Sequence, residues 1–200
     1  KLSVQPFFAS ELFIPQLARF THEHPDIDLS VNTSDESLEH HPSDADASIR
    51  LFRQVPVGLS ATPLFRLRLV PACTAQFRDT YISDGELYGS EIPLIIHNTR
   101  EDAWHLWYAE RGVSLPPDQR LMKLDSMIAV VRAAERGLGV ALVPVPLADA
   151  WFQSGAIVQL QGDPLATDDF YYLVYDANSD NVEQVRLLHD WVLQTFAAST

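Results

Sequence analysis

The chain has 200 residues and a formal net charge of −13, from 27 acidic against 14 basic side chains. This acidic balance disfavours direct binding to nucleic-acid phosphates, and no apolar run approaches the ~20 residues that span a membrane. The single Cys73 excludes an internal disulfide, which is consistent with a reducing compartment such as the cytoplasm. The chain begins at Lys1 without Met or a signal-like segment, so we expect a fragment or a processed form.

The first third of the chain alternates predicted strands with a predicted helix. Strand-like segments, with alternating or continuous apolar residues, lie at residues 2–4, 27–31, 47–51 and 59–72. Pro63 and Pro71 are expected to break the last of these segments, because proline lacks a backbone N–H. A helical stripe of apolar residues leads to His24, with Ser10 as the expected N-cap. Pro15 fits this helix only near its start or at a kink.

The remainder of the chain repeats this alternation, which is typical of α/β proteins with mainly parallel sheets. Predicted strands lie at residues 93–97, 120–124, 138–143, 157–160 and 170–175. Predicted helices lie at residues 101–111, 127–136, 146–154 and 181–198, and a polar linker is predicted at residues 162–169. The sequence contains no low-complexity tract and no short-period repeat.

The stretch from Leu124 to Pro146 is the most informative part of the chain. Asp125 and Ser126 can each cap a helix start, and Gly137 stands where that helix is expected to end. The apolar run at 138–143 suits a strand that is buried on both faces and ended by the two prolines that follow it. Because the helix follows a strand, its start should lie at the carboxyl edge of the sheet, where open α/β sheets bind ligands.

Several segments, in order, resemble the effector-binding (regulatory) domain of LysR-type transcriptional regulators. The similar segments are Val4–Ser10, Leu17–Leu29, Ala47–Arg50, Trp104–Trp107 and Asp125–Pro144, the last with its Gly-Leu-Gly-Val-Ala-Leu-Val-Pro run. Their order and spacing hold over nearly the whole chain. They most resemble the branch of this family that contains the AmpR and GcvA regulators.

The resemblance implies an α/β fold of the periplasmic-binding-protein-like type 2 class, with two Rossmann-like lobes joined by two crossover strands. Lobe I would comprise residues 1–70 and 168–200, and lobe II residues 71–167. A winged helix-turn-helix would precede Lys1, so DNA would be bound only through that missing domain, in agreement with the acidic charge. The resemblance further implies a cytoplasmic homodimer or tetramer with no membrane partner.

The resemblance also implies that the domain binds a small organic effector in the cleft between the lobes and thereby controls DNA binding and transcription. Helix starts from both lobes should face the cleft, and their free N–H groups and dipoles favour an acidic effector. Aromatic side chains beside them favour an effector with a ring. The expected ligand-binding residues are Phe7, Phe8, Ala9, Ser10, Thr33, Ser34, His97, Asn98, Asp125, Ser126, Met127 and Tyr171.

Each of these residues also has a structural interpretation, which the sequence leaves open. These interpretations are capping for Ser10 and Ser126, core packing for Phe7, Phe8 and Tyr171, turns for Thr33 and Ser34, and a satisfied structural histidine for His97. Arg50 is expected either to pair with an acid or to line the pocket floor. Trp104 and Trp107 are expected to pack a helix against the sheet rather than to stack on a ligand.

No catalytic residue, metal site or cofactor is predicted. His22 and His24 lie on different faces of a helix end, which is poor geometry for a metal. Cys73 has no His placed beside it by the sequence, and Ser126 is not part of a Gly-x-Ser-x-Gly elbow. Three alternatives to the sensor stay open: a periplasmic solute-binding receptor of a transporter, a small enzyme on the same fold, and a domain that only mediates oligomerisation.

Overall fold

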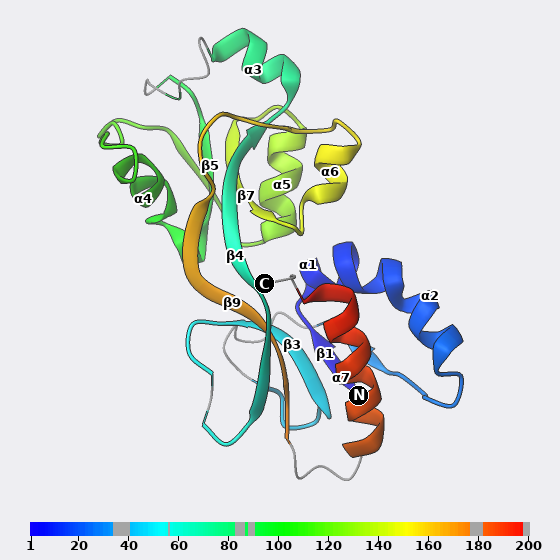
Figure 1. Cartoon of the computed structure of the whole chain (residues 1–200). Helices are drawn as coiled ribbons and strands as arrows, with labels where there is room; N and C mark the ends of the chain where they lie inside the picture. The colour runs from blue at the N-terminus through cyan, green and yellow to red at the C-terminus, as the bar shows by residue number, and fades with distance from the viewer. Residues whose placement is uncertain (34–40, 56, 83–86, 88–90, 177–181, 198–200) are drawn as a thin grey trace. The chain divides into compact units, whose positions relative to one another are not determined.

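Two long strands connect the two structural units of the chain (Figure 1). The computed structural model describes residues 1–33, 41–55, 57–82, 87, 91–176 and 182–197. Unit 1 comprises Lys1–Leu67 and Thr167–Thr200, and unit 2 comprises Arg68–Ala166. Strands β4 (Ser60–Cys73) and β9 (Leu165–Tyr175) each pass from one unit into the other.

Unit 1 is built on a mixed sheet with the strand order β2-β1-β3-β9, followed by β4. Its other strands are β1 (Leu2–Val4), β2 (Val31–Asn32) and β3 (Ala47–Phe52). Strand β1 lies between β2 and β3 and runs parallel to both, whereas β9 runs antiparallel to β3 and places Tyr171 opposite Leu51. All six residues of β3 are buried, as expected for a strand covered on both faces.

The helices of unit 1 supply much of its apolar core. They are α1 (Pro6–Phe8), the π-helix η1 (Ala9–Phe13), α2 (Ile14–Glu23) and α7 (Val182–Phe196). Pro15 lies in the first turn of α2, directly after the π-helix, which confirms its predicted place near a helix start or kink. The rings of Phe13 and Phe20 lie 5.8 and 5.1 Å from the ring of Trp191, so this helical run and α7 share one core.

Unit 2 contains strands in the order β4-β7-β5-β6, and β8 pairs with β4. Its further strands are β5 (Leu94–His97), β6 (Leu121–Leu124), β7 (Val140–Val145) and β8 (Val158–Gln159). Its helices are α3 (Ala75–Tyr81), the 3-10 helix η2 (Asn98–Arg100), α4 (Ala103–Ala109), α5 (Met127–Glu135) and α6 (Asp149–Gln153). Strand β5 runs parallel to both of its neighbours, and helices separate β5, β6 and β7 along the chain. This alternation confirms the predicted α/β class.

Two local predictions for unit 2 are confirmed. Trp104 is fully buried, and its ring N–H donates to the backbone oxygen of Ile95 at 3.0 Å, so it packs α4 against β5. Trp107 is buried beside it, with ring centroids 5.6 Å apart. Helix α5 is followed by Gly137 with φ of +71°, the left-handed conformation expected of a glycine that ends a helix.

The predicted breaks at Pro63, Pro71 and Pro144 are wrong, whereas β7 ends at Val145, directly before Pro146, as predicted. Strand β4 continues through Pro63 and Pro71, and β7 continues through Pro144. The carbonyl oxygen of Pro71 accepts a bond from the backbone N–H of Leu160 at 2.9 Å, and Pro144 accepts one from Ala148 at 2.9 Å. At Pro71 the strand tolerates the ring because proline removes only a donor, while its carbonyl oxygen is still used; the bond to Pro144 belongs to the turn that follows β7.

Two further element predictions are wrong in extent. The predicted polar linker at 162–169 is strand from Leu165 onward, because β9 is the continuous connection between the units. The predicted strand at 27–31 is shorter, since only Val31–Asn32 pairs with β1. Residues 27–30 alternate in burial, and Ser30 accepts the Leu2 N–H at 2.8 Å, but regular strand structure begins only at Val31, so the side-chain period alone overestimates the length of the strand.

Candidate functional site

Parallel pairing brings together the predicted ligand-binding residues of unit 2. His97, the last residue of β5, lies opposite Leu124, the last residue of β6. Asn98 therefore follows β5 at the same carboxyl edge of the sheet where Asp125 and Ser126 follow β6. This arrangement confirms that the start of α5 lies at the carboxyl edge, the position where open α/β sheets bind ligands.

The start of α5 carries no side-chain cap. Ser126 occupies the N-cap position with φ −124° and ψ 128°, and its carbonyl accepts a bond from Val130 N–H at 3.0 Å. Its hydroxyl makes no bond to the first turn, so the prediction that Ser126 or Asp125 caps the helix is wrong. The half-buried hydroxyl and the first backbone N–H groups of α5 are therefore available to an external acceptor.

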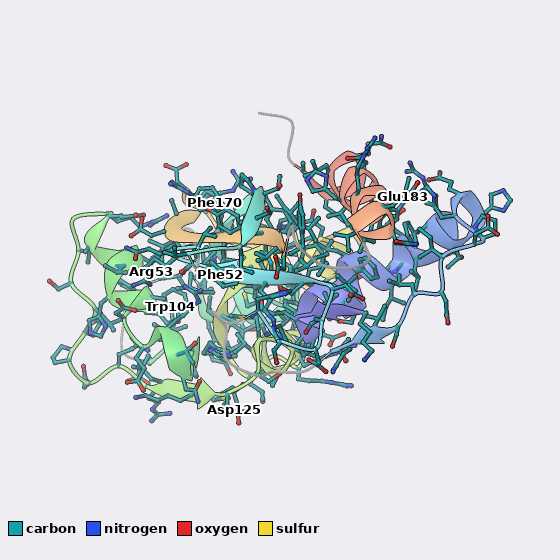
Figure 2. All side chains as sticks on the ribbon, turned by 90° about the horizontal axis from the view of Figure 1, so that it is seen from below. Phe52, Arg53, Trp104, Asp125, Phe170 and Glu183 are labelled. Carbon is teal, nitrogen blue, oxygen red and sulfur yellow. The ribbon has the colours of Figure 1, made fainter. Side chains whose placement is uncertain are left out.

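The other residues at this edge differ in exposure. His97 is half-buried, and its Nδ1 accepts a bond from the Thr99 N–H at 3.3 Å and lies 2.8 Å from the Thr99 hydroxyl. This ring caps η2, which agrees with the structural interpretation of His97. Asn98 and Asp125 are exposed, and Asp125 lies at the periphery in Figure 2. Met127, the first residue of α5, is half-buried.

Two alanine substitutions should distinguish the uncapped start of α5 from the capped start of α3. Thr74→Ala should lower the free energy of unfolding by about 1 kcal/mol, because the Thr74 hydroxyl accepts the Phe77 N–H at 3.0 Å and caps α3. Ser126→Ala should change it by less than about 0.5 kcal/mol, because no cap bond is lost. Urea unfolding of both variants measures the difference. Equal losses would show that Ser126 caps α5 in solution.

The predicted residues of unit 1 at the end of β1 are mostly buried. Phe7, Phe8 and Ala9 are 6%, 0% and 1% exposed. Ser10 is exposed, and its hydroxyl donates to the Phe7 carbonyl at 3.3 Å. Ser10 lies inside the helical run and Gln5 occupies the N-cap position, so the prediction that Ser10 is an N-cap is wrong. The helix begins earlier because Pro6 suits its first position.

Tyr171 belongs to an aromatic cluster in unit 1. Its ring centroid lies 5.2 Å from that of Phe8 and 5.2 Å from that of Phe65. The Phe8 and Phe65 rings stack with centroids 6.0 Å apart, and Phe196 meets Phe8 edge-on at 5.3 Å. Sequence reasoning did not include Phe65, because a single aromatic residue in a long strand carries no signal of which partners it meets.

The remaining predicted residues follow β2. Thr33 is exposed and comes directly after Asn32, the last residue of that strand. Because β2 runs parallel to β1, Thr33 leaves the sheet at the same edge as the segment that begins α1. Ser34 lies outside the described residues.

Three buried polar side chains lie beside this edge of unit 1; sequence reasoning considered Arg50 for the pocket floor but did not consider Ser3 or Gln5. Ser3, Gln5 and Arg50 are 2%, 6% and 0% exposed. Arg50 donates from Nη2 to the Ser3 hydroxyl at 2.7 Å. Among the described residues, Oε1 of Gln5 has no hydrogen-bond partner. Ser3 and Gln5 alternate with the apolar Leu2 and Val4, which is the one sequence signal that could have placed them on a common face.

The residues that the structure describes give no support for a cysteine nucleophile, a metal site or a membrane-spanning helix. The Cys73 thiol is fully buried, and this desolvation raises its pKa to about 11, so it stays protonated at neutral pH and is a poor nucleophile. No group of three His, Cys, Asp or Glu side chains is placed to hold a metal ion within the described ranges. None of the described helices has the length and hydropathy needed to cross a membrane.

Comparison with known proteins identifies the family. The family model of the LysR substrate binding domain matches residues 1–197. The chain belongs to this family. The predicted LysR-type resemblance is therefore confirmed, and so is the periplasmic-binding-protein-like type 2 α/β fold.

Individual relatives agree with the predicted AmpR and GcvA branch. The transcriptional activator AmpR of Rhodobacter capsulatus is 26% identical over 192 residues, covering 96% of this chain and 65% of that protein. The glycine cleavage system transcriptional activator of Escherichia coli K12 is 24% identical over 207 residues, covering 98% of this chain and 65% of that protein. The chain thus spans slightly less than two thirds of each. Both relatives are named as transcriptional activators and not as enzymes.

A solved structure shows the same fold. The effector domain of the transcriptional regulator AmpR of Pseudomonas aeruginosa superposes with a TM-score of 0.83 and 24% identity, covering 98% of this chain and 94% of that one. At this identity the similarity is evidence for the fold, whereas the ligand has to be argued from the site itself.

Proposed function

We propose that this chain is the sensing domain of a LysR-type transcriptional regulator and that its effector is a small organic acid. The observation that carries the proposal is the start of α5. There no side chain caps the first backbone N–H groups, and the Ser126 hydroxyl makes no bond to them. Such a helix start offers hydrogen-bond donors and a positive dipole end to a carboxylate. Asn98 and Met127, close to it at the same edge, would contact the remainder of the effector.

In this proposal the effector binds in the cleft that the family resemblance implies between the lobes. Unit 1 would contribute Ser10, Thr33 and Ser34, together with the Tyr171 hydroxyl. Because Phe7 and Phe8 are buried, their rings would pack behind the residues that contact the effector. An effector that binds the closed form better than the open form would shift the population of the two, and only such a difference in affinity can transmit a signal.

The whole regulator would use this shift to reorient its DNA-binding domains. We propose that those domains precede this chain and that the effector domains associate as dimers or tetramers. The names of the AmpR and glycine cleavage relatives support a role in transcription. The net charge of −13 supports the assignment of DNA binding to another part of the protein.

A thermal-shift screen of this chain against small organic acids tests the proposal. A true effector at a hundredfold excess over Kd should stabilise the fold by about 2.7 kcal/mol. The neutral amide or methyl ester of the same compound should stabilise it much less, because the helix start recognises the charge. Absence of stabilisation by any acid would contradict the proposal and favour a domain that only mediates oligomerisation.

Ser126→Asp should weaken binding of such an acid by about tenfold or more, because a carboxylate at the N-cap occupies the donors and repels the ligand. Aspartate is itself a good N-cap, so the variant should fold at least as well as the parent chain. Ser114→Asp, an equal charge change at an exposed position of unit 2, should leave the affinity within about twofold. Equal affinities in both variants would exclude the start of α5 as the anion site.

A further inference from the structure

The side chain of Gln5 is a buried polar group that the described part of the chain leaves without a hydrogen bond to its oxygen. Gln5 follows β1 directly and is 6% exposed. Among the described residues, its Oε1 has no hydrogen-bond partner. Buried side-chain oxygens of folded proteins are bonded in the large majority of cases, and an exception needs an explanation such as strain or a function. A donor from outside the chain that reaches this oxygen would be stabilised by it.

The local structure explains why the neighbouring residues supply no donor. Gln5 occupies the N-cap position of α1, but its side chain makes no cap bond, and glutamine is not among the residues favoured there. The next residue, Pro6, has no backbone N–H. The register of β1 with β3 places Arg50 beside Gln5, yet Nη2 of Arg50 donates to the Ser3 hydroxyl at 2.7 Å.

The backbone of Gln5 is held in place on both sides. Its N–H donates to the Ile49 carbonyl at 3.2 Å, and its own carbonyl accepts the Ala9 N–H at 2.8 Å. The last side-chain torsion of glutamine is broad and roughly two-fold, so half a turn exchanges Oε1 with the amide nitrogen. A ligand donor at this edge can therefore meet Oε1 without movement of the strand.

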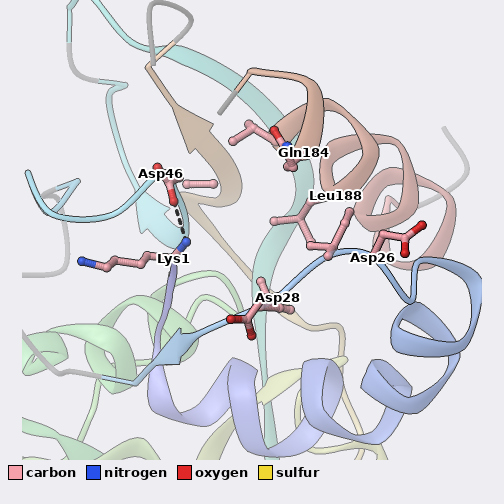
Figure 3. Close-up of a pocket in the computed structure, with 10 residues that line it drawn as sticks. Lys1, Asp26, Asp28, Asp46, Gln184 and Leu188 are labelled. Carbon is pink, nitrogen blue, oxygen red and sulfur yellow. Dashed lines mark hydrogen bonds and ion pairs between the residues drawn. The ribbon is translucent and has the colours of Figure 1, made fainter. Parts of the chain in front are cut away.

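Gln5 lies at the edge of unit 1 that carries the proposed effector residues. Phe7–Ser10 follow it in the chain, and Thr33 leaves β2 at the same edge. The amino end of β1 meets a different feature, a cavity of about 360 Å³ that is lined by Lys1 and Asp46 among others (Figure 3). Gln5 is not among the residues that line this cavity. The unbonded oxygen therefore belongs to the effector edge.

We propose that Oε1 of Gln5 accepts a hydrogen bond from the effector, so that the effector carries an N–H or O–H donor in addition to its carboxylate. This inference rests on the proposed function: the start of α5 would bind the carboxylate, and Gln5 would select among acids by their donor. An acid without a donor leaves the buried oxygen unbonded, and a site that bonds a polar group discriminates strongly against an analogue that lacks it.

Acids that share a carbon skeleton test the donor on the unmodified chain. Carbon 2 carries an amino group, a hydroxyl, an oxo group or only hydrogen, as in phenylalanine, phenyllactate, phenylpyruvate and 3-phenylpropionate. Glutamate, 2-hydroxyglutarate, 2-oxoglutarate and glutarate form a second series, and alanine, lactate, pyruvate and propionate a third. Thermal shift as a function of concentration gives each Kd. In a series that binds, the amino or hydroxy acid should bind at least about tenfold tighter than the unsubstituted acid.

The possible results separate the two proposals. Equal binding across a series would overturn the role of Gln5, and so would tightest binding of the oxo acid, which offers an acceptor in place of the donor. Both results would leave the organic-acid proposal intact. Failure of every acid in the three series and in the wider screen would contradict the proposed function itself, and the role of Gln5 with it. A difference between the amino and the hydroxy acid identifies which donor is used.

Gln5→Met locates the contact, because methionine has a similar length and lacks the carboxamide. It should reduce the preference for the donor-bearing acid to within about twofold and leave the Kd of the unsubstituted acid within about twofold. Gln119→Met is the matched control. Oε1 of Gln119 also has no partner among the described residues, but Gln119 precedes the amino end of β6, away from the effector edge. An equal loss of preference in both variants would overturn the assignment.

The stability of Gln5→Met gives a second readout without any ligand. Because the variant replaces an unbonded buried oxygen by an apolar group, the midpoint of urea unfolding should stay unchanged or rise. Ser3→Ala removes a hydroxyl that is bonded to Arg50 and should lower the midpoint. A midpoint for Gln5→Met as low as that for Ser3→Ala would mean that Oε1 is already bonded in the ligand-free chain, and the proposal would be wrong.

Discussion

Replacement of Phe8 by alanine is expected to lower the free energy of unfolding by about 3–5 kcal/mol, the range for a phenylalanine removed from a packed core. The side chain of Phe8 is fully buried. Its ring centroid lies 5.2 Å from Tyr171, 5.3 Å from Phe196 and 6.0 Å from Phe65. These rings belong to β9, α7 and β4, so the cavity left by alanine would loosen three elements of unit 1 at once.

Urea unfolding followed by fluorescence and by circular dichroism measures this loss. Leu106→Ala is the control, because the Leu106 side chain is 50% exposed on α4 and its removal should cost less than about 1 kcal/mol. A loss for Phe8→Ala no larger than that of the control would mean that the ring borders open space. In that case Phe8 would return to the set of direct ligand contacts.

Much of the fold could be predicted because the local signals are strong and agree with one another. The strand at residues 2–4, the apolar strand that ends at His97, and the helix stop at Gly137 all appear in the structure as the sequence indicates. Each of these signals depends on neighbours along the chain. Helix stops, buried strands and their order are therefore accessible to pattern reasoning.

The prolines show where such reasoning fails. Pro71 and Pro144 lack a backbone donor, which favours a strand break, but β4 and β7 continue through them, and the Pro71 oxygen still accepts the Leu160 N–H. Whether a strand needs the N–H at one position depends on register with its partners. Register is a property of the assembled sheet, and nothing adjacent to the proline in the sequence reveals it.

For the candidate site, the sequence indicates where strands lead into helices but not how buried the residues at those connections are. Parallel pairing of β5 with β6 places Asn98 near Ser126, as the strand-to-helix pattern indicates. The same pattern says nothing of burial, so it could not separate Phe8, which is fully buried, from Ser10, which is exposed. Likewise, the buried carboxamide of Gln5 becomes visible only when the sheet is assembled.

Gly139→Ala is expected to destabilise unit 2 by about 3 kcal/mol, the upper end for added atoms in a packed interior. A Cβ at this position would lie 2.3 Å from the backbone oxygen of Pro93 and 3.0 Å from its carbonyl carbon. That same oxygen accepts the Val140 N–H at 2.9 Å, where β7 begins to pair with β5. Backbone cannot rotate away as a side chain can, so relief of the clash requires β7 to separate from β5.

Gly155→Ala is the matched control for this substitution. Gly155 has φ of +72° and no atom within 4 Å of an added Cβ, so alanine should cost only the strain of the left-handed conformation, about 1–2 kcal/mol. Thermal unfolding of both variants, and hydrogen exchange at Val140, measure the difference. The Gly139 variant should show the larger loss and faster exchange at Val140, because the Val140 N–H donates to the same Pro93 oxygen that the added Cβ would meet. A smaller loss than in the control would show that β5 and β7 can separate slightly at this contact without cost.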